Sequence, residues 1–360
     1  MFIDFNLLQQ LIAIDSPSGF TNKAAEFIFD ALTSYGLSPT YTRKGAVRCS
    51  LGENPTLSIA AHVDTLGAVV AHINNDGTLR ISTIGGLSLP SFEGSYCKVY
   101  TMNKKVYTGT LLFDNASTHN NNTTESTVRS VKNLHIRIDE LVNSKDDVKT
   151  LGINIGDFIC FEPHYQETNS GFIKSKFMDN KAACLVLLEI AKYTTTHNFN
   201  CPVELYFSNY EEVGHGGAGA FGNNIEELLV VDMGVVGNER AGLETHCSIC
   251  TKDSASPYDY EMRCQLVQLA IQHNIPYSLD IYPHYGSDGS AAWRAGLDAK
   301  VALIGMGVAA SHGIERTHKQ GIKATIDLCL AYIAKKFNNG VLMLPTANII
   351  IFTPNLLLEN

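Results

Sequence analysis

Histidine, aspartate and glutamate side chains recur in this 360-residue sequence at points where a buried strand is expected to end or a helix to begin. Imidazole nitrogen and carboxylate oxygen are ligands that zinc and cobalt accept in proteins. The candidates are His62 and Asp64 in AAHVDT, Asp179 in KFMDNKAAC, Glu211 and Glu212 in FSNYEEVGHGG, Asp232 in LLVVDMG, and His312 and His318 in SHGIERTHKQG. This mixture predicts a metal site built from histidines and carboxylates.

The number of candidates is large enough for two divalent metal ions. Two metals about 3.5–4 Å apart need a carboxylate that bridges them, and each then takes one histidine and one further carboxylate. A further acid must stay off the metals and act as general base on the attacking water. Glu211 and Glu212 can supply one ligand and one base, because neighbours in sequence point in different directions. The pattern predicts metal-assisted hydrolysis.

Each candidate also has an ordinary structural explanation when it is taken alone. A lone His-x-Asp is more often structural than catalytic, a Glu-Glu pair is usually solvated, and Asp179 fits a helix N-cap equally well. The Glu-Glu pair, however, follows a predicted buried strand and precedes Val-Gly-His-Gly-Gly, an unusual place for a free surface. The order and context of the candidates together favour a catalytic site.

Other features give weaker signals. Cys247 and Cys250 have no second pair beside them, so ordinary thiols are expected. The segment Gly214–Gly219 lacks the Lys-Ser/Thr of a phosphate loop and is expected to allow close backbone approach near the metals. Further candidates for lining the pocket are Ser287, Asp288 and Ser290.

The elements that must position these residues alternate between strands and helices. Strands are expected at Leu57–Ala61, Val203–Ser208, Leu228–Asp232 and Val301–Ile304, and helices within residues 1–35 and at Ala182–Tyr193, Met262–Gln272 and Ala324–Lys335. Such alternation predicts an α/β fold with a mainly parallel sheet and helices on both faces. In these sheets ligands collect at the carboxyl ends of the strands.

The region from about 70 to 165 has a different pattern, with short strand-like runs separated by Gly, Asn and Ser. The runs are Gly77–Ile84, Tyr96–Met102 and Lys105–Leu112, and a short helix is expected near Ile138–Asn143. We therefore predict a catalytic domain over residues 1–69 and 166–360, with an inserted β-rich domain over residues 70–165. The apolar tail, residues 340–360, is expected to pack on the core or in a subunit interface.

Composition narrows the class of protein. The net charge of −9, from 36 acidic and 27 basic residues, argues against nucleic acid as a partner. The chain shows no signal-peptide pattern and no run of about 20 apolar residues, so we expect a cytoplasmic protein with no membrane partner. The nine scattered cysteines fit reduced thiols.

The same motifs resemble those of a known family over nearly the whole chain. AAHVDTLG, KFMDNKAACLVLLE, YEEVGHGGA, VVDMG, GSDGSAAWRAG and INIGDFICFEP are similar to segments of the glutamyl aminopeptidase or deblocking (tetrahedral) aminopeptidase family of dinuclear metallopeptidases. Asn180 is a departure, because the family usually has a second Asp there. The resemblance implies a zinc-peptidase-like fold with a small β-barrel-like insertion. It also implies a homo-oligomer, often dimers building a twelve-subunit shell.

The resemblance implies a role for each candidate. One metal would take His62 and Asp232 and the other Glu212 and His312, with Asp179 as the bridge. Glu211 would be the general acid/base, and Asp64 would orient His62. His312 is preferred over His318 as the last ligand because it comes first after the strand and has Glu315 close behind it.

The expected function is therefore a metallo-aminopeptidase that uses two divalent ions to remove residues from the N-terminus of peptides. Zinc or cobalt is favoured, and manganese also suits these ligands. Three alternatives stay open at this point. One is a metal-dependent amidase or deacylase acting on a small N-acylated peptide or osmolyte, and another is a glycosidase, which would use paired acids without metals. The third, from a different class, is an oligomeric scaffold without activity.

Overall fold

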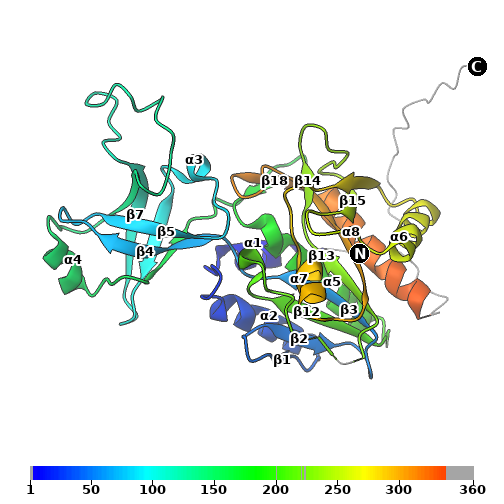
Figure 1. Ribbon diagram of the computed structural model, residues 1–360. Coiled ribbons are helices and arrows are strands. Elements are labelled where there is room, and N and C mark those ends of the chain that lie inside the picture. The colour runs from blue at the N-terminus through cyan, green and yellow to red at the C-terminus, as the bar shows by residue number, and fades with distance from the viewer. Residues whose placement is uncertain (1–2, 200, 220, 223, 338–360) are drawn as a thin grey trace, which may run out of the picture.

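The computed structural model describes residues 3–199, 201–219, 221–222 and 224–337. The chain forms a large α/β part and a separate closed β-barrel, which lie side by side and are joined through a narrow waist (Figure 1). The apolar tail for which we expected packing on the core or in an interface, residues 340–360, lies outside the described residues.

The large part is built on a 12-stranded mixed sheet whose path runs β1-β2-β12-β3-β13-β17-β18-β11-β10. Off this path, β14 and β15 pair with β17, and β16 pairs with β15. At its centre β3 pairs in parallel with both β12 and β13, and β13 pairs in parallel with β17, whereas the outer pairs of the path are antiparallel. The strands are β1 (Thr40–Tyr41), β2 (Val47–Ser50), β3 (Leu57–His62), β10 (Gln166–Glu167), β11 (Phe172–Ser175), β12 (Val203–Ser208), β13 (Glu227–Val231), β14 (Gly234–Val236), β15 (Cys247–Lys252), β16 (Tyr277–Ile281), β17 (Lys300–Ala309) and β18 (Glu315–His318).

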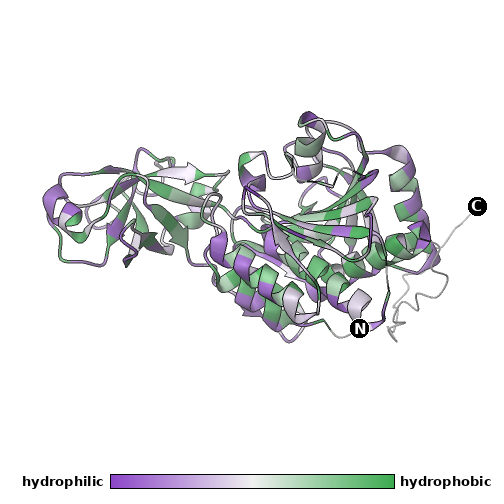
Figure 2. Cartoon of the chain, turned by 90° about the horizontal axis from the view of Figure 1, so that it is seen from below, coloured by the Kyte–Doolittle hydropathy of each residue, from purple (hydrophilic) through white to green (hydrophobic). Residues whose placement is uncertain are grey.

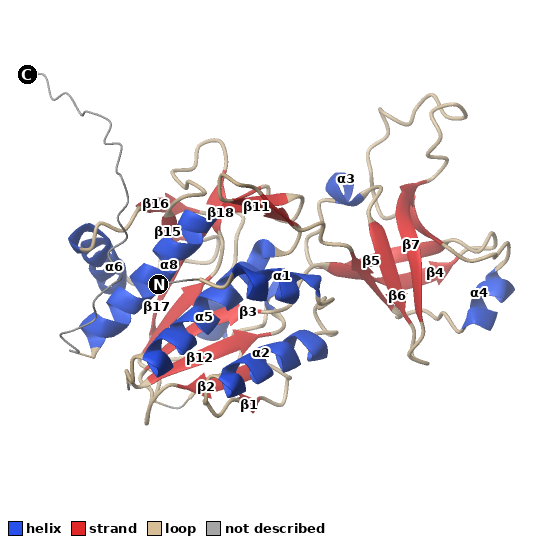
Figure 3. Cartoon of the chain, turned by 180° about the vertical axis from the view of Figure 1, so that it is seen from behind, coloured by secondary structure: helices blue, strands red, loops and turns tan. Residues whose placement is uncertain are grey.

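Helices cover both faces of this sheet, as predicted. Most of them pack on one face of the sheet, the face that is turned toward the viewer in Figure 3. Helix α7 lies on the opposite face. The helices are α1 (Phe5–Ala13), α2 (Asn22–Ser34), α5 (Met178–Thr196), α6 (Tyr260–Gln272), α7 (Asp288–Arg294) and α8 (Lys319–Lys336). Each face of the sheet has its own apolar core, and successive side chains of β3 point into them in turn. Ile59 and Ala61 pack on the side of the many helices, and Ala60 packs on the side of α7.

Burial on both faces explains why the central strands are continuously apolar. All six residues of β3 and all six of β12 are buried, which is typical of parallel strands covered on both sides. In Figure 2 these strands are largely green, and several of the covering helices have a green side toward the sheet and a purple side toward the outside. None of the described helices is both long and apolar enough to cross a membrane.

The barrel is closed by six strands in the order β4-β5-β8-β7-β6-β9. Its elements are β4 (Gly67–Ile73), β5 (Leu79–Ile84), α3 (Leu89–Phe92), β6 (Tyr96–Tyr100), β7 (Val106–Phe113), β8 (Leu134–Ile138), α4 (Lys145–Leu151) and β9 (Phe158–Phe161). The β-rich insertion is thus a barrel with its own apolar core. Its exact limits at residues 70 and 165 stay a prediction.

The helix expected near Ile138–Asn143 was wrong in position. Ile138 ends strand β8, and the helix α4 begins only at Lys145. The reason is the cap: the Ser144 side chain accepts a hydrogen bond from the backbone N–H of Asp147, which satisfies a free donor of the first turn. Gly152, at φ 89°, ends the helix in the left-handed conformation.

Candidate metal centre

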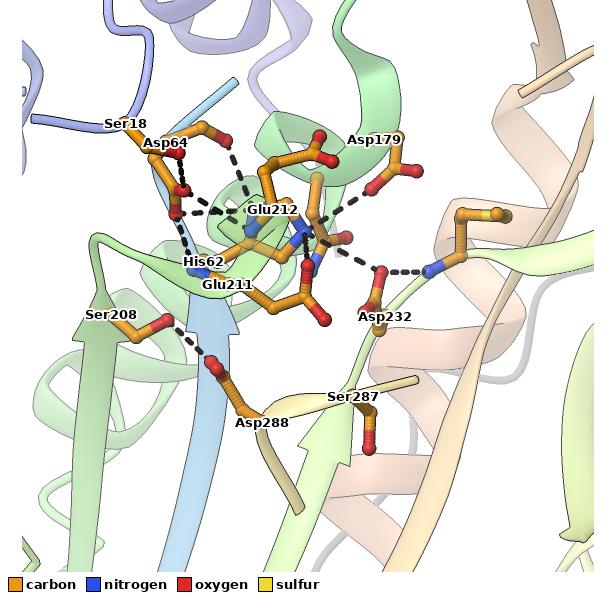
Figure 4. A network of polar contacts seen from close by, with 12 residues as sticks. Ser18, His62, Asp64, Asp179, Ser208, Glu211, Glu212, Asp232, Ser287 and Asp288 are labelled. Carbon is orange, nitrogen blue, oxygen red and sulfur yellow. Dashed lines mark hydrogen bonds and ion pairs between the residues drawn. The ribbon is translucent and has the colours of Figure 1, made fainter. Parts of the chain in front are cut away.

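The predicted ligands come together at the carboxyl ends of adjacent central strands. His62 is the last residue of β3, Asp232 directly follows β13, and Glu211 and Glu212 lie in the short 3-10 turn η1 (Glu211–Val213) after β12. Because β12, β3 and β13 are neighbours and parallel, their ends meet on one edge of the sheet. Figure 4 shows these side chains converging, with Asp179 added from the first turn of α5.

The first group of polar atoms surrounds the imidazole of His62. Its Nε2 lies 3.2 Å from Asp179 Oδ1, 3.7 Å from Glu211 Oε2 and 3.8 Å from Asp232 Oδ1. The backbone carbonyl of Asp64 lies 3.0 Å from His62 Nδ1. A carbonyl can only accept, so Nδ1 carries a hydrogen, and the neutral imidazole that a metal ion binds would have its lone pair on Nε2, on the carboxylate side.

The second group surrounds His312, which lies in the loop between β17 and β18. Its Nε2 is 3.4 Å from Asp179 Oδ2 and 3.4 Å from Glu212 Oε2. Asp179 therefore presents one carboxylate oxygen to each histidine. Two atoms that are each bound about 2.0–2.1 Å from a tetrahedral metal ion lie roughly 3.4 Å apart, so the spacing of both groups suits a cation between the atoms.

The charges of the cluster also fit a bound cation. Burial and the neighbouring carboxylates raise the pKa of Glu211 and Glu212 well above the usual value, and burial and Asp179 raise the pKa of Asp232 to about 7. Glu212 Oε1 is buried and has no hydrogen-bond partner among the described residues. Buried anions without a partner are costly, and a divalent cation would supply the missing positive charge.

Asp179 is the exception among these acids. Burial opposes its ionisation, but in the metal-free protein both imidazoles have a raised pKa, and the hydrogen bonds that His312 and His62 donate hold the Asp179 pKa well below the usual range. Burial likewise opposes protonation of His312, yet the contact with Asp179 raises the His312 pKa to about 9. Asp179 is thus the acid of the cluster that ionises most readily, because it lies between two histidines.

Asp64 does more than orient His62. Its carboxylate accepts hydrogen bonds from Ser18 Oγ at 2.5 Å and from the backbone N–H groups of Glu211 and Glu212 at 3.1 and 3.3 Å. The Asp64 carboxylate is farther from His62 Nδ1, at 3.5 Å, than its own backbone carbonyl is. The side chain therefore fixes the Glu-Glu turn, and the main chain fixes the imidazole.

Asn180, which stands where the family pattern usually has a second Asp, binds the main chain beside the cluster. Its Nδ2 donates to the backbone carbonyl of Val231 at 2.9 Å, directly before Asp232. Only an amide or another donor can make this bond to a carbonyl. Asn180 thus ties the start of α5 to the end of β13.

Glu315 is a site residue whose role sequence reasoning missed. Its carboxylate is buried and accepts the backbone N–H of Asp179 and that of His312, both at 3.1 Å. Its position three residues after His312 was the available signal. His318 lies elsewhere: its Nδ1 caps α8 by accepting from the Gln320 N–H, and its Nε2 is 2.8 Å from the Ser170 carbonyl.

A cavity of about 780 Å³ opens beside the cluster. Apolar and aromatic side chains form part of its wall, namely Met233, Val235, Tyr282, Pro283 and Tyr285. Ser287 and Ser290 line it as expected.

Asp288 is instead buried beneath the Gly-rich segment and accepts a hydrogen bond from Ser208. A Cβ on Gly216 would lie 2.3 Å from Asp288 Oδ1, so the glycine there permits close approach.

Comparisons with known proteins place the chain among peptidases. A family model described as M42 glutamyl aminopeptidase matches residues 45–328. YhfE of Bacillus subtilis (strain 168), named as a candidate aminopeptidase, is 41% identical over 332 residues, covering 91% of this chain and 96% of that protein.

Two solved structures share the fold. A TET aminopeptidase from the marine sediment archaeon Thaumarchaeota archaeon SCGC AB-539-E09 has a TM-score of 0.82 at 18% identity, covering 91% of this chain and 95% of that one. The TET1 peptidase of Pyrococcus horikoshii has a TM-score of 0.80 at 20% identity, covering 91% and 98%.

Proposed function

The chain belongs to the M42 glutamyl aminopeptidase family, and from this premise we propose that it removes N-terminal residues from peptides with two divalent metal ions and a glutamate general base. As a member of this family it is an aminopeptidase, a hydrolase of peptide bonds. The observation that carries the two-metal proposal is the placement of Asp179, whose two oxygens face His62 and His312 separately. A single-metal site would not need a carboxylate shared in this way.

The proposed ligands divide into two sets around that bridge. One ion would be held by His62 and Asp232, and the other by Glu212 and His312, with Asp179 common to both. Zinc or cobalt is proposed because both accept nitrogen and oxygen ligands, and manganese also suits this donor set.

Glu211 is proposed as the acid/base because it lines the cavity and its side chain is more exposed than that of Asp232. Its side chain is 15% exposed, whereas that of Asp232 is 4% exposed, although both lie within 4 Å of His62 Nε2. Burial raises the pKa of Glu211 above the usual value, and a stronger base suits a group that takes a proton from water.

When bound, the two ions supply Lewis acidity toward the scissile carbonyl and lower the pKa of the attacking water. Glu211 takes the proton from that water and delivers it to the amine that leaves. Asp64 holds Glu211 in place through the backbone N–H it accepts, and Asp179 stays ionised throughout. The apolar part of the cavity wall would contact the side chain of the N-terminal residue.

We further propose a cytoplasmic homo-oligomer. The Pyrococcus horikoshii TET1 peptidase can assemble into a tetrahedron or a large octahedral shell, and a similar arrangement of this chain would use the barrel as an assembly module. The proposed division is a catalytic domain over residues 1–69 and 166–360 and an assembly domain over residues 70–165.

Metal content measured together with activity tests the proposal. Elemental analysis of purified protein is followed by hydrolysis of aminoacyl-anilides and N-acyl peptides, before and after chelation. About two metals per chain with chelator-sensitive cleavage of free-amine substrates is expected. Cleavage only of blocked substrates would make the enzyme an amidase or deacylase, and absence of metal binding would overturn the mechanism.

A further inference from the structure

The ligand His312 is held from outside the large sheet, by a segment that belongs to the barrel. Residues 85–91 leave strand β5 and lead into α3. The carbonyl of Gly86 lies 2.9 Å from His312 Nδ1, and the backbone N–H of Ser88 donates to the His312 carbonyl at 3.2 Å. The segment thus contacts both the ring and the main chain of one residue.

The backbone of His312 adopts a conformation that needs such support. Its φ is 62°, in the left-handed region that residues with a side chain rarely enter, and Ala310 two residues before it has φ 55°. Such conformations persist when the surroundings determine them strongly, and they cluster at functional sites. The Glu315 carboxylate binds the backbone N–H of His312, and residues 85–91 of the barrel bind its backbone carbonyl and its ring.

The fit between the two parts is tight at two glycines, where a side chain would force its neighbours to shift. A Cβ on Gly86 would lie 3.2 Å from His312 Nδ1. Gly85 has φ +71°, and a Cβ there would come within 2.5 Å of Leu66 Cδ2 and 3.3 Å of the Glu212 carbonyl. Glycines at both positions therefore let the barrel segment approach two of the proposed ligands, His312 and Glu212.

We propose that segment 85–91 of the barrel is a positioning element of the second metal site, a role beyond assembly. Because the Gly86 carbonyl can only accept, it keeps a hydrogen of His312 on Nδ1, so that the neutral imidazole, the form that binds a metal ion, has its lone pair on Nε2, which faces Asp179 and Glu212. The inference rests on the proposed function, since it requires a metal at His312. Its consequence is that a displaced barrel weakens one metal site and spares the other.

Substitution of Gly86 by Ala tests this, with Gly237→Ala as the matched control because a Cβ at Gly237 meets nothing within 4 Å. Metal-free proteins are titrated with cobalt(II), and the visible absorption bands and competition with a chelator give the affinity of each site. Gly86→Ala is expected to weaken one of the two sites by about 10-fold or more, as loss of an orienting partner does elsewhere. Gly237→Ala should match the parent at both sites.

A second pair of variants removes a single donor and covers the case in which Gly86→Ala does not fold. Ser88→Pro deletes the N–H that binds the His312 carbonyl, and its φ of −76° suits proline. Ser88→Ala keeps that N–H and is the control.

Ser88→Pro should weaken one cobalt site while Ser88→Ala does not. Two parent-like sites in both Gly86→Ala and Ser88→Pro would overturn the inference alone, whereas a parent that binds no cobalt would overturn the proposed function as well.

Discussion

The carboxylates of the cluster have different surroundings, and these differences separate their roles. Asp179 faces two imidazoles that lower its pKa, whereas Glu211 faces one imidazole and lies near Asp232 and Asp288, whose charges add to burial in raising its pKa. Environments that push the pKa values of neighbouring acids apart are typical of sites where one acid stays charged and another exchanges protons. The bridge and the base are assigned on this contrast.

Glu211→Gln is expected to abolish proton transfer while leaving both metals bound. The amide has nearly the shape of the carboxylate but cannot accept the proton of the attacking water, so kcat should fall by about 10²–10⁴-fold. Steady-state kinetics with an aminoacyl-anilide, beside elemental analysis, provides the measurement. The control is Glu212→Gln, which should lose metal; a Glu211→Gln enzyme with near-parental kcat would refute the base assignment.

Stability of the metal-free protein should fall as pH rises. Burial raises the pKa of Asp232 to about 7 and that of Glu315 to about 8, above the value of about 4 in unfolded chains. The folded state therefore binds more protons than the unfolded state in this window, so its stability decreases with pH. His312, whose pKa is raised to about 9, acts in the same direction, and the lowered pKa of Asp179 matters only below about pH 4.

Thermal unfolding by circular dichroism checks this dependence. With chelator present, the melting temperature should drop between about pH 5 and pH 9, and saturating zinc or cobalt should reduce the drop because the cation neutralises the carboxylates. A melting temperature that rises with pH in the metal-free protein would contradict the expected direction.

At the level of elements, the sequence predicted the four central strands of the large sheet, β3, β12, β13 and β17, but not the strands around them or the order of the sheet. His62 and Asp232 follow apolar runs whose burial is unmistakable, and parallel pairing of β3 and β13 then places both at one edge. The β-rich character of the insertion was equally readable from short runs and turn residues. These features depend on local patterning, which a single sequence contains.

Contacts between distant segments could not be read in this way. The Glu315 side chain binds the N–H of Asp179 across 136 positions, and Gly86 binds His312 across 226 positions. Such bonds depend on how the barrel and the sheet pack, and nothing in the local pattern encodes that packing. The helix expected near Ile138–Asn143 failed for a local reason, because the capping role of Ser144 was overlooked.

Glu315→Gln is expected to destabilise the protein and loosen the second metal. The carboxylate accepts two backbone N–H groups, and the amide can accept only one of them, which leaves a buried donor unpaired at a cost of about 1–3 kcal/mol. Urea unfolding at pH 9, where Glu315 is ionised, measures the loss. Glu244→Gln, which weakens a partly exposed pair with Arg316, is the control and should cost less than about 1 kcal/mol. Equal losses in the two variants would contradict the bridging role.

The whole molecule has an apolar core on each face of the large sheet and a third core inside the barrel, and the barrel also exposes large apolar side chains. Its β6–β7 hairpin exposes Tyr96, Met102 and Val106, with relative exposures of 59%, 78% and 48%. Met102 and Val106 lie at the turn end of this hairpin, whereas Tyr96 lies at its other end, and exposed apolar side chains that lie together mark surfaces that contact another molecule. In the proposed homo-oligomer, this hairpin is the candidate contact.

Replacing Met102 and Val106 together by Lys should therefore dissociate the assembly, because two buried ammonium groups would cost more than the apolar contacts supply. Light scattering coupled to size-exclusion chromatography gives the mass of parent and variant. Ile271→Lys serves as the control, since Ile271 is 62% exposed on α6, far from the barrel along the chain. A double variant that keeps the parental mass would exclude the hairpin as the contact, and a monomeric parent would exclude the oligomer itself. Because neither Met102 nor Val106 is among the residues that contact His312, the dissociated variant should still bind two cobalt ions per chain.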